Sequence, residues 1–349
     1  MLKKLFSIEK KNLHYIVRFF GLKLHFRSLK LAYQKIKQLE ARQITPRRAE
    51  FFWAAEEKFT VRDKLWYLSQ EFYEVVGYFP NIKNPKSFNE KLHWLKLNYY
   101  NPAENICIDK CSVKDYVREK LGEGFTIPLL GVYEDVNDID FDVLPEKFVI
   151  KTPFDGGGLG MIVVDRKKGV DYDRLKYDIN AMMPRWHSLY YRFLSRGYRE
   201  IEPKILIEEY LPVREGKAIE YKMFCFHGEM KFCLADCDYF GRKPHRALYD
   251  RNFEQLPFKI GRIKYKPLAE KPANYDKMVE LAEKLAADFP HVRVDFYDVN
   301  GKVYVGEMSF SSASGFGIFT PREWDFKIGE YLDLNKLNPE YVKIVDEFK

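Results

Sequence analysis

The chain has 349 residues, 46% of them hydrophobic and 16% aromatic, so it can bury a large core and does not have the composition of a disordered protein. Its five cysteines, an odd number without a C-x-x-C pair, argue against a disulfide framework or a structural zinc site and favour a reducing cytoplasm. The net charge of +7 is concentrated in residues 1–48, which carry thirteen Lys or Arg against two Glu and leave a net charge of −4 on the remainder. Because the basic residues gather at one end and no DNA-reading motif is present, the sequence argues against a nucleic-acid-binding protein.

Residues 1–40 interleave apolar residues with Lys and Arg, which predicts a basic, amphipathic and helical N-terminal segment. Such a segment suits the surface of an anionic membrane, and the alternative is a basic helix that packs on the body or contacts a partner. No run of the chain approaches 18 uncharged apolar residues, and its start lacks the apolar region and cleavage site of a signal peptide. We therefore expect a cytoplasmic protein, either free or held peripherally at the inner face of the membrane.

From Thr45 to about Asn101, apolar residues recur at three- and four-residue spacing, which predicts helices with a buried face. The stretch PKSFNEKLHWLK begins with Pro85 and Ser87 ahead of Glu90. This order favours a helix start, because the serine hydroxyl can accept from backbone N–H groups that have no partner within the helix. A further helix is expected to follow Asp109.

A glycine-rich loop follows the predicted strand KFVIK, which ends in Lys151. Gly156, Gly157 and Gly158 carry no Cβ, so their backbone N–H groups can approach phosphate oxygens. The loop is not a Walker A motif, since no G-K-[ST] follows, and it is not a Rossmann fingerprint, since a strand rather than a helix comes next. Taken alone it is compatible with a nucleotide-binding loop and with an ordinary turn.

The stretch ILIEEYL is predicted to be a strand that runs into an acidic hinge, and two strands that turn at residues 227–229 follow it. Lys222 alternates with apolar neighbours on the first of these strands, so its side chain should face away from the core. A basic, loop-rich stretch at residues 239–273 comes next. NYDKMVELAEKLAADF then predicts a strongly amphipathic helix.

The stretch 291–317 contains the clearest chemical pattern of the sequence. His291 to Asp298 and Lys302 to Phe310 are expected to pair as a hairpin across Val-Asn-Gly. Asp295 and Glu307 can then lie side by side, and two like charges on neighbouring strands repel unless a cation or basic groups lie between them. A Mg²⁺ ion that also holds substrate phosphates would meet this need, and the alternative is an ordinary surface hairpin whose carboxylates face water.

The order of these motifs along the chain resembles the ATP-grasp fold. A DK pair is followed 41 residues later by FVIK with its glycine-rich loop, then by the ILIEEYL hinge, an acidic-x-Lys strand, and a late Asp and Glu on paired strands. Within a span of about residues 85–333, PKSFNEKLHWLK, DKCSVKDYVREK, EYKMFCFHG and RVDFYDVNGKVYVGEMSF resemble the TupA-like ATP-grasp proteins of teichuronopeptide and surface-polysaccharide biosynthesis.

The resemblance implies an α+β fold in which two α+β subdomains grip a nucleotide, preceded by a helical, basic N-terminal extension. We expect a basic amphipathic segment at 1–44, a helical region at 45–106, a segment with the first phosphate lysine at 107–146, a small ATP-grasp subdomain at 147–212, a large subdomain with the metal site at 213–335, and a polar tail at 336–349.

The resemblance also implies which residues bind ATP and Mg²⁺. The cofactor-binding residues that it implies are Lys110, Lys151, Gly156, Gly157 and Gly158 at the phosphates, Glu208, Glu209, Tyr210 and Leu211 at the adenine hinge, Glu220 on the ribose side, and Lys222 near the terminal phosphates. Asp295 and Glu307 match the metal carboxylates, and Arg293 would act with Lys151 and Lys222 on the moving phosphoryl group. Many ATP-grasp enzymes have E-x-N at the metal site, whereas Ser309 stands here in the place of Asn, so water or another residue would complete the octahedron and the number of metal ions stays open.

These parts suit the ATP-dependent joining of a carboxylate to an amine through an acyl phosphate, here during the biosynthesis or modification of bacterial surface polysaccharide. We expect an amino acid or amine as donor and a uronic acid, glycan or similar carboxylate as acceptor, contacted by His245, Arg246, Ser309 and Ser311. A kinase or glycosyltransferase of a polysaccharide locus and a catalytically degenerate nucleotide-binding scaffold are the alternatives. No D-x-D motif lies in a pattern that supports a sugar transferase, and the presence of both carboxylates and all three lysines argues against a degenerate scaffold.

Overall fold

The computed structural model describes residues 60–348 except 155–159, 184–193, 199, 212–218, 238–243 and 269, together with three short strands near the N-terminus. These strands, β1 (Phe6–Lys11), β2 (His14–Phe19) and β3 (Leu22–Phe26), pair antiparallel in that order. The prediction of a helical N-terminal extension is therefore wrong for these residues. The physical reason can be read from LKLHF, where apolar and basic residues alternate with the period of two that a strand requires.

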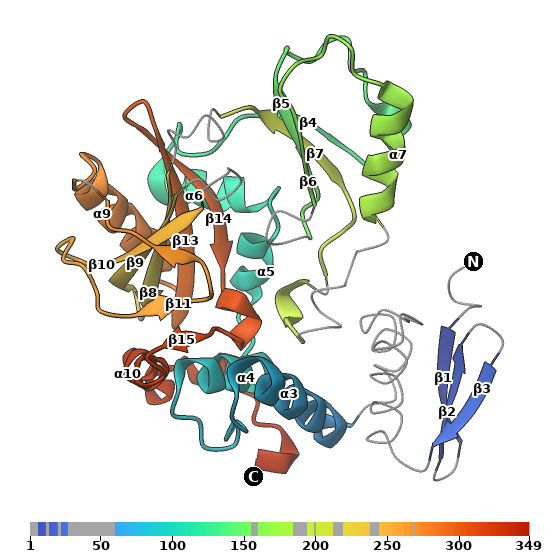
Figure 1. Ribbon diagram of the computed structural model, residues 1–349, viewed down its shortest axis with the longest axis vertical. Coiled ribbons are helices and arrows are strands. Elements are labelled where there is room, and N and C mark those ends of the chain that lie inside the picture. The colour runs from blue at the N-terminus through green and yellow to red at the C-terminus, as the bar shows by residue number, and fades with distance from the viewer. Residues whose placement is uncertain are drawn as a thin grey trace.

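Four helices lead from Thr60 into the body of the protein. α3 (Val61–Val76) and α4 (Phe88–Asn98) each begin at a capping box, in which a hydroxyl and an acidic side chain serve each other's backbone N–H groups. The box at α4 joins Ser87 and Glu90, which confirms the helix start predicted there. α5 (Pro102–Ile108) and α6 (Val113–Leu121) follow, and α10 (Glu323–Tyr331) near the C-terminus packs beside α4 (Figure 1).

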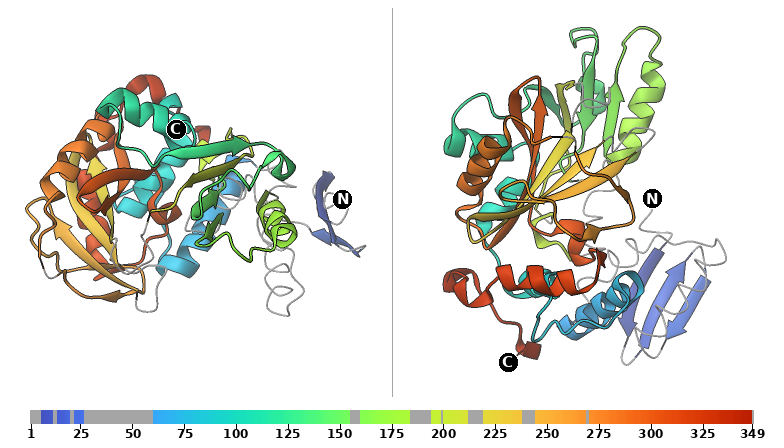
Figure 2. Two further views of the ribbon diagram at one scale, coloured as in Figure 1. Left: turned by 90° about the horizontal axis from the view of Figure 1, so that it is seen from above. Right: turned by 60° about the vertical axis from the view of Figure 1, so that its left-hand side comes forward.

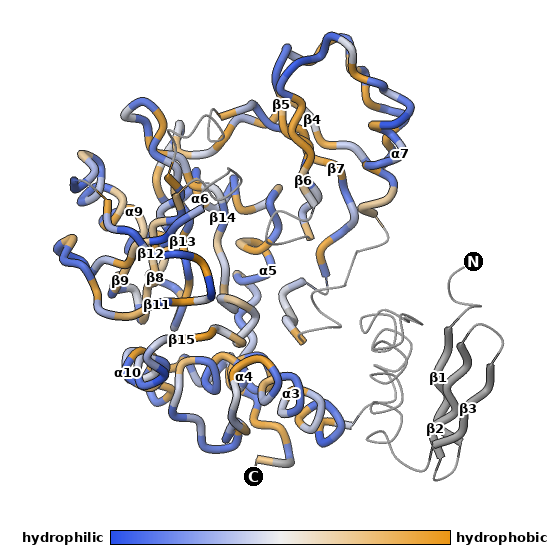
Figure 3. The backbone as a smooth tube through the Cα atoms, viewed as in Figure 1, coloured by the Kyte–Doolittle hydropathy of each residue, from blue (hydrophilic) through white to orange (hydrophobic). Residues whose placement is uncertain are grey.

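A four-stranded antiparallel sheet and one helix form the smaller lobe, seen in green in Figures 1 and 2. Its strands are β4 (Leu129–Tyr133), β5 (Phe148–Lys151), β6 (Met161–Val164) and β7 (Ile205–Glu209), in the spatial order β4-β7-β5-β6. The helix α7 (Tyr172–Met182) packs on the apolar residues of β5 and β7, which are coloured orange in Figure 3. Lys151 ends β5, so a buried strand carries it to the edge of the lobe, while Gly156, Gly157 and Gly158 lie outside the described residues.

A six-stranded sheet organises the larger lobe. Its spatial order is β12-β10-β9-β8-β13-β14, antiparallel except between β10 and β12. The strands are β8 (Ile219–Phe226), β9 (Glu229–Cys237), β10 (His245–Asp250), β12 (Lys264–Tyr265), β13 (His291–Val299) and β14 (Lys302–Ser309). A separate pair joins β11 (Lys259–Ile260) to β15 (Phe319–Thr320).

The two faces of the six-stranded sheet are covered by different helices. The amphipathic helix predicted from the sequence is α9 (Tyr275–Ala286), and it packs with α6 on the face that carries Met223, Val292 and Val294. α4 and α10 pack on the opposite face, against Phe224 and Phe226. Lys222 shares this second face with Phe224, because side chains two residues apart on a strand point the same way.

The hairpin of β13 and β14 contains a β-bulge. Asn300 and Gly301 occupy the turn with φ of 54° and 78°, as the Asn-Gly pair predicted. Asp295 pairs with Glu307, but Phe296 pairs with Val305, which leaves Gly306 as an extra residue.

The bulge reverses the alternation of side chains along β14. Val303 and Val305 are buried in the core, whereas Glu307, only two residues after Val305, faces the other side of the sheet and Met308 returns to the core. An ideal strand would have placed Glu307 among the valines.

Short 3₁₀ segments complete the described chain: η3 (Val136–Asp138), η5 (Arg196–Tyr198), η6 (Ser312–Gly315), η7 (Leu334–Lys336), η8 (Pro339–Tyr341) and η9 (Asp346–Phe348). All five cysteines are free. Of the helices in the described ranges, none has both the length and the apolar character that crossing a membrane requires.

Candidate functional site

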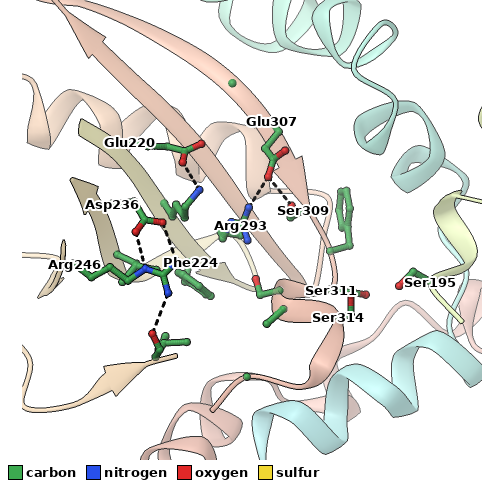
Figure 4. Close-up of a pocket in the computed structure, with 18 of the residues that line it drawn as sticks. Ser195, Glu220, Phe224, Asp236, Arg246, Arg293, Glu307, Ser309, Ser311 and Ser314 are labelled. Atoms are coloured by element: carbon green, nitrogen blue, oxygen red, sulfur yellow. Dashed lines mark hydrogen bonds and ion pairs between the residues drawn. The ribbon is translucent and has the colours of Figure 1, made fainter. Parts of the chain in front are cut away.

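A cavity of about 390 Å³ lies between the two lobes, against the sheet face that carries Lys222 and Glu307 (Figure 4). The smaller lobe contributes Lys151, and the turn between α5 and α6 contributes Lys110. Among the described residues, the charged side chains that line the cavity are Lys110, Lys151, Lys222, Arg246 and Arg293, against Glu220, Asp236 and Glu307. This excess of basic groups suits a ligand that carries phosphate.

Arg293 joins the two carboxylates of the hairpin. Its Nε donates to Oδ1 of Asp295 at 2.6 Å, and its Nη2 donates to Oδ2 of the same residue at 2.6 Å. The same Nη2 donates to Oε1 of Glu307 at 2.6 Å, and the hydroxyl of Ser309 reaches that oxygen at 3.3 Å. The structure thus places Asp295 beside Glu307, as the sequence predicted, with a guanidinium between them.

Lys222 extends this network across β8. Its Nζ lies 2.9 Å from Oδ2 of Asp295 and 2.5 Å from Oε2 of Glu220. The hydroxyl of Tyr297 donates to Oε1 of Glu220 at 2.9 Å. Lys222, predicted to face away from the core on its strand, lines the cavity, whereas Asp295 has no exposed surface and does not line it.

The charges of the network shift the pKa values of its members. Burial alone would raise the pKa of Glu307, but Arg293, Lys110 and Lys222 lower it to about 2. Burial raises the pKa of Asp295 to about 6, and the positive charges of Arg293 and Lys222 oppose that rise. Burial would lower the pKa of Lys222, but Asp295 and Glu220 raise it above its usual value, so the lysine stays protonated.

Lys151 is held by a second buried group of charges. The Nζ of Lys151 lies 2.6 Å from Oε2 of Glu208, and the Nζ of Lys114 lies 2.7 Å from Oε1 of the same residue. Lys114 also donates to the carbonyl oxygen of Ile127 at 2.7 Å. Burial would raise the pKa of Glu208, but the two lysines lower it below its usual value, so the carboxylate stays ionised and fixes Lys151 at the cavity wall.

The residues predicted at the adenine hinge are not part of the described cavity wall. Glu208 turns its carboxylate to the lysines, and Glu209 is exposed, with its backbone N–H bonded to Pro128. The ring of Tyr210 lies 5.3 Å from Nζ of Lys147, and Leu211 is buried.

Most of the residues predicted to contact substrates line the cavity, and one does not. Arg246, Ser309 and Ser311 line the cavity, whereas His245 does not. Arg246 donates through Nε and Nη2 to the two carboxylate oxygens of Asp236, at 2.6 and 3.2 Å. Asp236 belongs to a D-x-D motif that lies in no pattern supporting a sugar transferase, and the structure shows it as the buried partner of Arg246.

The carboxylate pair fits a divalent cation in part. In the described part of the chain, no group of three or more His, Cys, Asp or Glu side chains is placed to hold a metal ion. Glu307 and Ser309 present oxygen atoms to the cavity, and Asp295 adds a carboxylate behind the guanidinium of Arg293. The oxygens of Glu307 and Ser309 fit a Mg²⁺ ion that takes its remaining ligands from phosphate and water, whereas both oxygens of Asp295 are held by Arg293 and Lys222 and do not line the cavity.

A serine-rich loop after β14 forms another part of the wall, with Ser311, Ser312, Ala313 and Ser314. Ala313 and Ser314 have φ of 48° and 54°, in the left-handed region that residues other than glycine rarely adopt.

Three side chains of α4 hold the backbone of this loop. Lys96 Nζ donates to the carbonyl oxygen of Ser314 at 2.6 Å, and His93 Nε2 lies 2.9 Å from that of Gly315. Asn89 donates to the carbonyl oxygen of Gly317 at 2.8 Å and accepts from its N–H at 2.9 Å.

Sequence reasoning missed this support. Asn89, His93 and Lys96 are four and three residues apart, which places them on one helix face, and that spacing was the available signal. The role of Lys114 as a second partner of Glu208 was also missed, although Lys114 lies only four residues after the predicted Lys110.

A model of a known protein family matches most of the chain. The model of the family described as TupA-like ATPgrasp matches residues 90–333, more than half of the chain. A search of curated proteins returns no match.

Solved structures with a similar fold include D-alanine–D-alanine ligase from Helicobacter pylori, at 18% identity over 71% of this chain and 69% of that one, with a TM-score of 0.39. The ATP complex of the Bacillus anthracis D-alanine–D-alanine ligase matches at 17% identity over 64% and 61%, with a TM-score of 0.37. An ADP complex of N5-carboxyaminoimidazole ribonucleotide synthetase matches at 12% identity over 69% and 56%, with a TM-score of 0.41.

The chain spans less than two thirds of the length of the last two proteins. Because their TM-scores are below 0.5, these likenesses carry no weight in the assignment to a family. The assignment rests on the family match, which covers most of α4, both lobes and all the charged residues of the cavity wall. The chain therefore belongs to the TupA-like ATP-grasp family.

Proposed function

We propose that the protein is an ATP- and Mg²⁺-dependent carboxylate–amine ligase. The observation that carries the proposal is the cavity, in which lysines from both lobes surround Glu307 and the arginine that Glu307 shares with the buried Asp295. A carboxylate is a poor electrophile, so transfer of the γ-phosphoryl group of ATP to one of its oxygens, with release of ADP, creates an acyl phosphate. An amine nitrogen then attacks the acyl carbon, inorganic phosphate leaves, and the nitrogen loses a proton.

The protein's own groups would position and neutralise the reacting charges, and no protein nucleophile is required. Lys151 would hold the phosphates from the smaller lobe and Lys110 from the turn between α5 and α6, while Lys222 and Arg293 would face them from the six-stranded sheet. Bound Mg²⁺, held by Glu307 with Asp295 behind it across Arg293, would supply further positive charge next to the terminal phosphates. Such preorganised charges lower the barrier because they need no rearrangement when charge moves in the transition state.

We extend the proposal to the biological setting that the family resemblance implies. The acceptor would be a uronic acid, glycan or similar carboxylate of a bacterial surface polysaccharide, and the donor an amino acid or other amine. The basic residues 1–40 would attach the protein peripherally to the anionic inner face of the membrane.

The alternatives have less support at the site. A glycosyltransferase would need carboxylates for the metal of a nucleotide sugar, and in the 236–238 D-x-D motif both carboxylate oxygens of Asp236 are taken by Arg246. A kinase would use the same phosphate-binding groups with a hydroxyl acceptor. Amide formation would be recognised by a requirement for both a carboxylate and an amine.

The test is release of ADP and phosphate with Mg·ATP and a panel of uronic acids, amino acids and glycans, supplied singly and in pairs. Lys151→Ala should weaken ATP binding measured by calorimetry, and Lys284→Ala, which removes an exposed lysine of α9, should not. ATP affinity in Lys151→Ala equal to that of the parent would show that the phosphate site lies elsewhere.

A further inference from the structure

A buried aspartate of α10 holds the helix residue that supports the serine-rich loop. Asp325 is 1% exposed and does not line the cavity. Its Oδ1 accepts from the backbone N–H of Asn89 at 3.0 Å, and its Oδ2 accepts from the side-chain Nδ2 of Asn89 at 2.9 Å. The hydroxyl of Tyr78 donates to the same Oδ2 at 3.3 Å. Asp325 thus holds Asn89 at two points, its backbone and its amide.

The negative charge of Asp325 is costly to bury. Burial raises the pKa of its carboxyl group, and hydrogen bonds from Asn89, Ser87 and Tyr78 oppose that rise. These three donors are neutral, and the N-terminus of α4, which Asp325 meets at the N–H of Asn89, compensates the charge in part. An asparagine would fill the same space without a charge. The carboxylate therefore points to a task that an amide at this position cannot perform.

The carboxylate determines which way the amide of Asn89 faces. Because a carboxylate only accepts hydrogen bonds, the NH₂ group of Asn89 must face Asp325 and its Oδ1 must face away. In that orientation Oδ1 accepts from the N–H of Gly317 at 2.9 Å, and Nδ2 also donates to the carbonyl oxygen of Gly317 at 2.8 Å. An asparagine at position 325 would present its own NH₂ group to one of the two donors of Asn89 and would allow the reverse orientation.

Gly317 lies at the end of the serine-rich loop, and both belong to the cavity wall. Residues 311–314 and Gly317 line the cavity directly after β14. Ala313 and Ser314 lie in the left-handed region, a strain that the surroundings of the loop must impose. A Cβ at Gly317 would come within 3.3 Å of Oδ1 of Asn89, so the two residues are in close contact. The bonds from Asn89 therefore fix where the loop ends and how it faces the cavity.

We propose that Asp325 is a positioning residue of the site: through the amide of Asn89 it fixes the serine-rich loop, and the loop fixes the substrate that is not the nucleotide. The proposal rests on the proposed ligase function, which assigns the phosphates to the lysines and the arginine of the cavity and leaves the loop to the second substrate. Asp325 touches neither ligand. Its loss should therefore weaken the binding of one substrate and spare the nucleotide.

Asp325→Asn tests the proposal, because it keeps the size of the side chain and lets the amide of Asn89 turn. By mass spectrometry, we expect the backbone amides of residues 310–317 to exchange hydrogen about tenfold faster, since both bonds to Gly317 weaken. The amides of α9 should exchange as in the parent. ADP release is measured with the pair of panel compounds that the parent turns over fastest. KM for one member of the pair should rise about tenfold, with the affinity for the β,γ-methylene analogue of ATP unchanged.

Two further variants separate positioning from folding. Glu330→Gln neutralises an exposed carboxylate of the same helix, and none of these quantities should change. The double variant Asp325→Asn with Asn89→Asp restores a hydrogen bond between the two side chains, but it turns a carboxylate oxygen toward the carbonyl oxygen of Gly317. The double variant should regain the melting temperature of the parent while loop exchange and KM stay raised. If Asp325→Asn does not fold, the double variant decides.

Parent-like loop exchange and KM in folded Asp325→Asn, or full recovery of both in the double variant, would overturn the proposal and leave the ligase function standing. If no pair of the panel is turned over, hydrogen exchange in the loop decides alone. Failure of the parent protein to bind the ATP analogue would overturn the proposed function, and the inference with it.

Discussion

Arg293 and Glu307 share a hydrogen bond of 2.6 Å between neighbouring strands, and the same nitrogen of Arg293 bonds Asp295 at 2.6 Å. One guanidinium therefore neutralises two carboxylates that would otherwise repel each other. If one of the two carboxylates is lost, Arg293 keeps the other as its partner. This arrangement separates the effect of a substitution on catalysis from its effect on folding.

Glu307→Gln keeps the size of the side chain and removes its charge. We expect kcat to fall at least roughly a hundredfold, since losing one preorganised electrostatic contact costs about 3 kcal/mol of barrier. The melting temperature should change little, because Arg293 keeps Asp295. The measurement is ADP formation beside thermal unfolding, with and without Mg·ATP.

Glu280→Gln serves as the control for this substitution, because it neutralises an exposed carboxylate of α9 that pairs with Lys284. Its turnover and melting temperature should match those of the parent. Near-normal turnover in Glu307→Gln would show that the metal site lies elsewhere. A collapse of its melting temperature, with ATP binding and Mg²⁺ dependence intact, would show that Glu307 serves the fold.

Glu208 is buried and its neighbour Glu209 is exposed, so the same substitution at both positions compares a buried carboxylate with an exposed one. Glu208→Gln leaves the buried Lys114 and the partly buried Lys151 without their counter-charge, and removing one partner of a buried ion pair costs about 3–5 kcal/mol of unfolding free energy. Glu209→Gln changes an exposed side chain and should cost well under 1 kcal/mol. Urea unfolding of both variants gives the comparison, and equal midpoints would refute the structural role of the Glu208 pairs.

Lys96 should make stability depend on pH above neutrality. Burial lowers the pKa of Lys96 to about 7, whereas the unfolded chain keeps the ordinary value near 10.5. Between these two values the unfolded state binds more protons, so the free energy of unfolding should rise with pH from about 7 to 10.5. Lys96→Met should lose this part of the rise. The measurement is urea unfolding at several pH values, and parallel profiles for the two proteins would contradict the shift.

The basic N-terminal segment should bind anionic vesicles in a salt-sensitive manner, because residues 1–48 carry thirteen Lys or Arg against two Glu. We expect the full chain to co-sediment with such vesicles at low salt, and a chain that starts at Thr45 to stay in solution. Neutral vesicles provide the control. Equal co-sedimentation of the two chains would remove the membrane proposal.

Sequence patterns predicted the parts of the fold that depend on local physics. The Asn-Gly hairpin, the Ser87 helix start and the amphipathic helix α9 each follow from residues that are close together in the chain, and the structure contains all three. The N-terminal strands differ from the predicted helix because apolar and basic residues in LKLHF alternate with period two, which is the pattern of a strand.

The partners within the site were harder to predict, since they depend on contacts between distant residues. Asp236 and Arg246 come from adjacent strands, and Asn89 is more than two hundred residues from the loop that it holds. A periodic pattern can say that a side chain is polar and on one face, but only the packing of α4 against the sheet shows which backbone groups it meets.

The β-bulge at Gly306 lets one short strand satisfy two incompatible demands. Before it, β14 contributes Val303 and Val305 to the core, and after it the strand delivers Glu307 to the cavity. If Gly306 were paired as an ordinary strand residue, strict alternation would turn Glu307 toward the apolar interior, away from Asp295. The shift in side-chain alternation at the bulge therefore matters to the site as much as the identity of its carboxylates does.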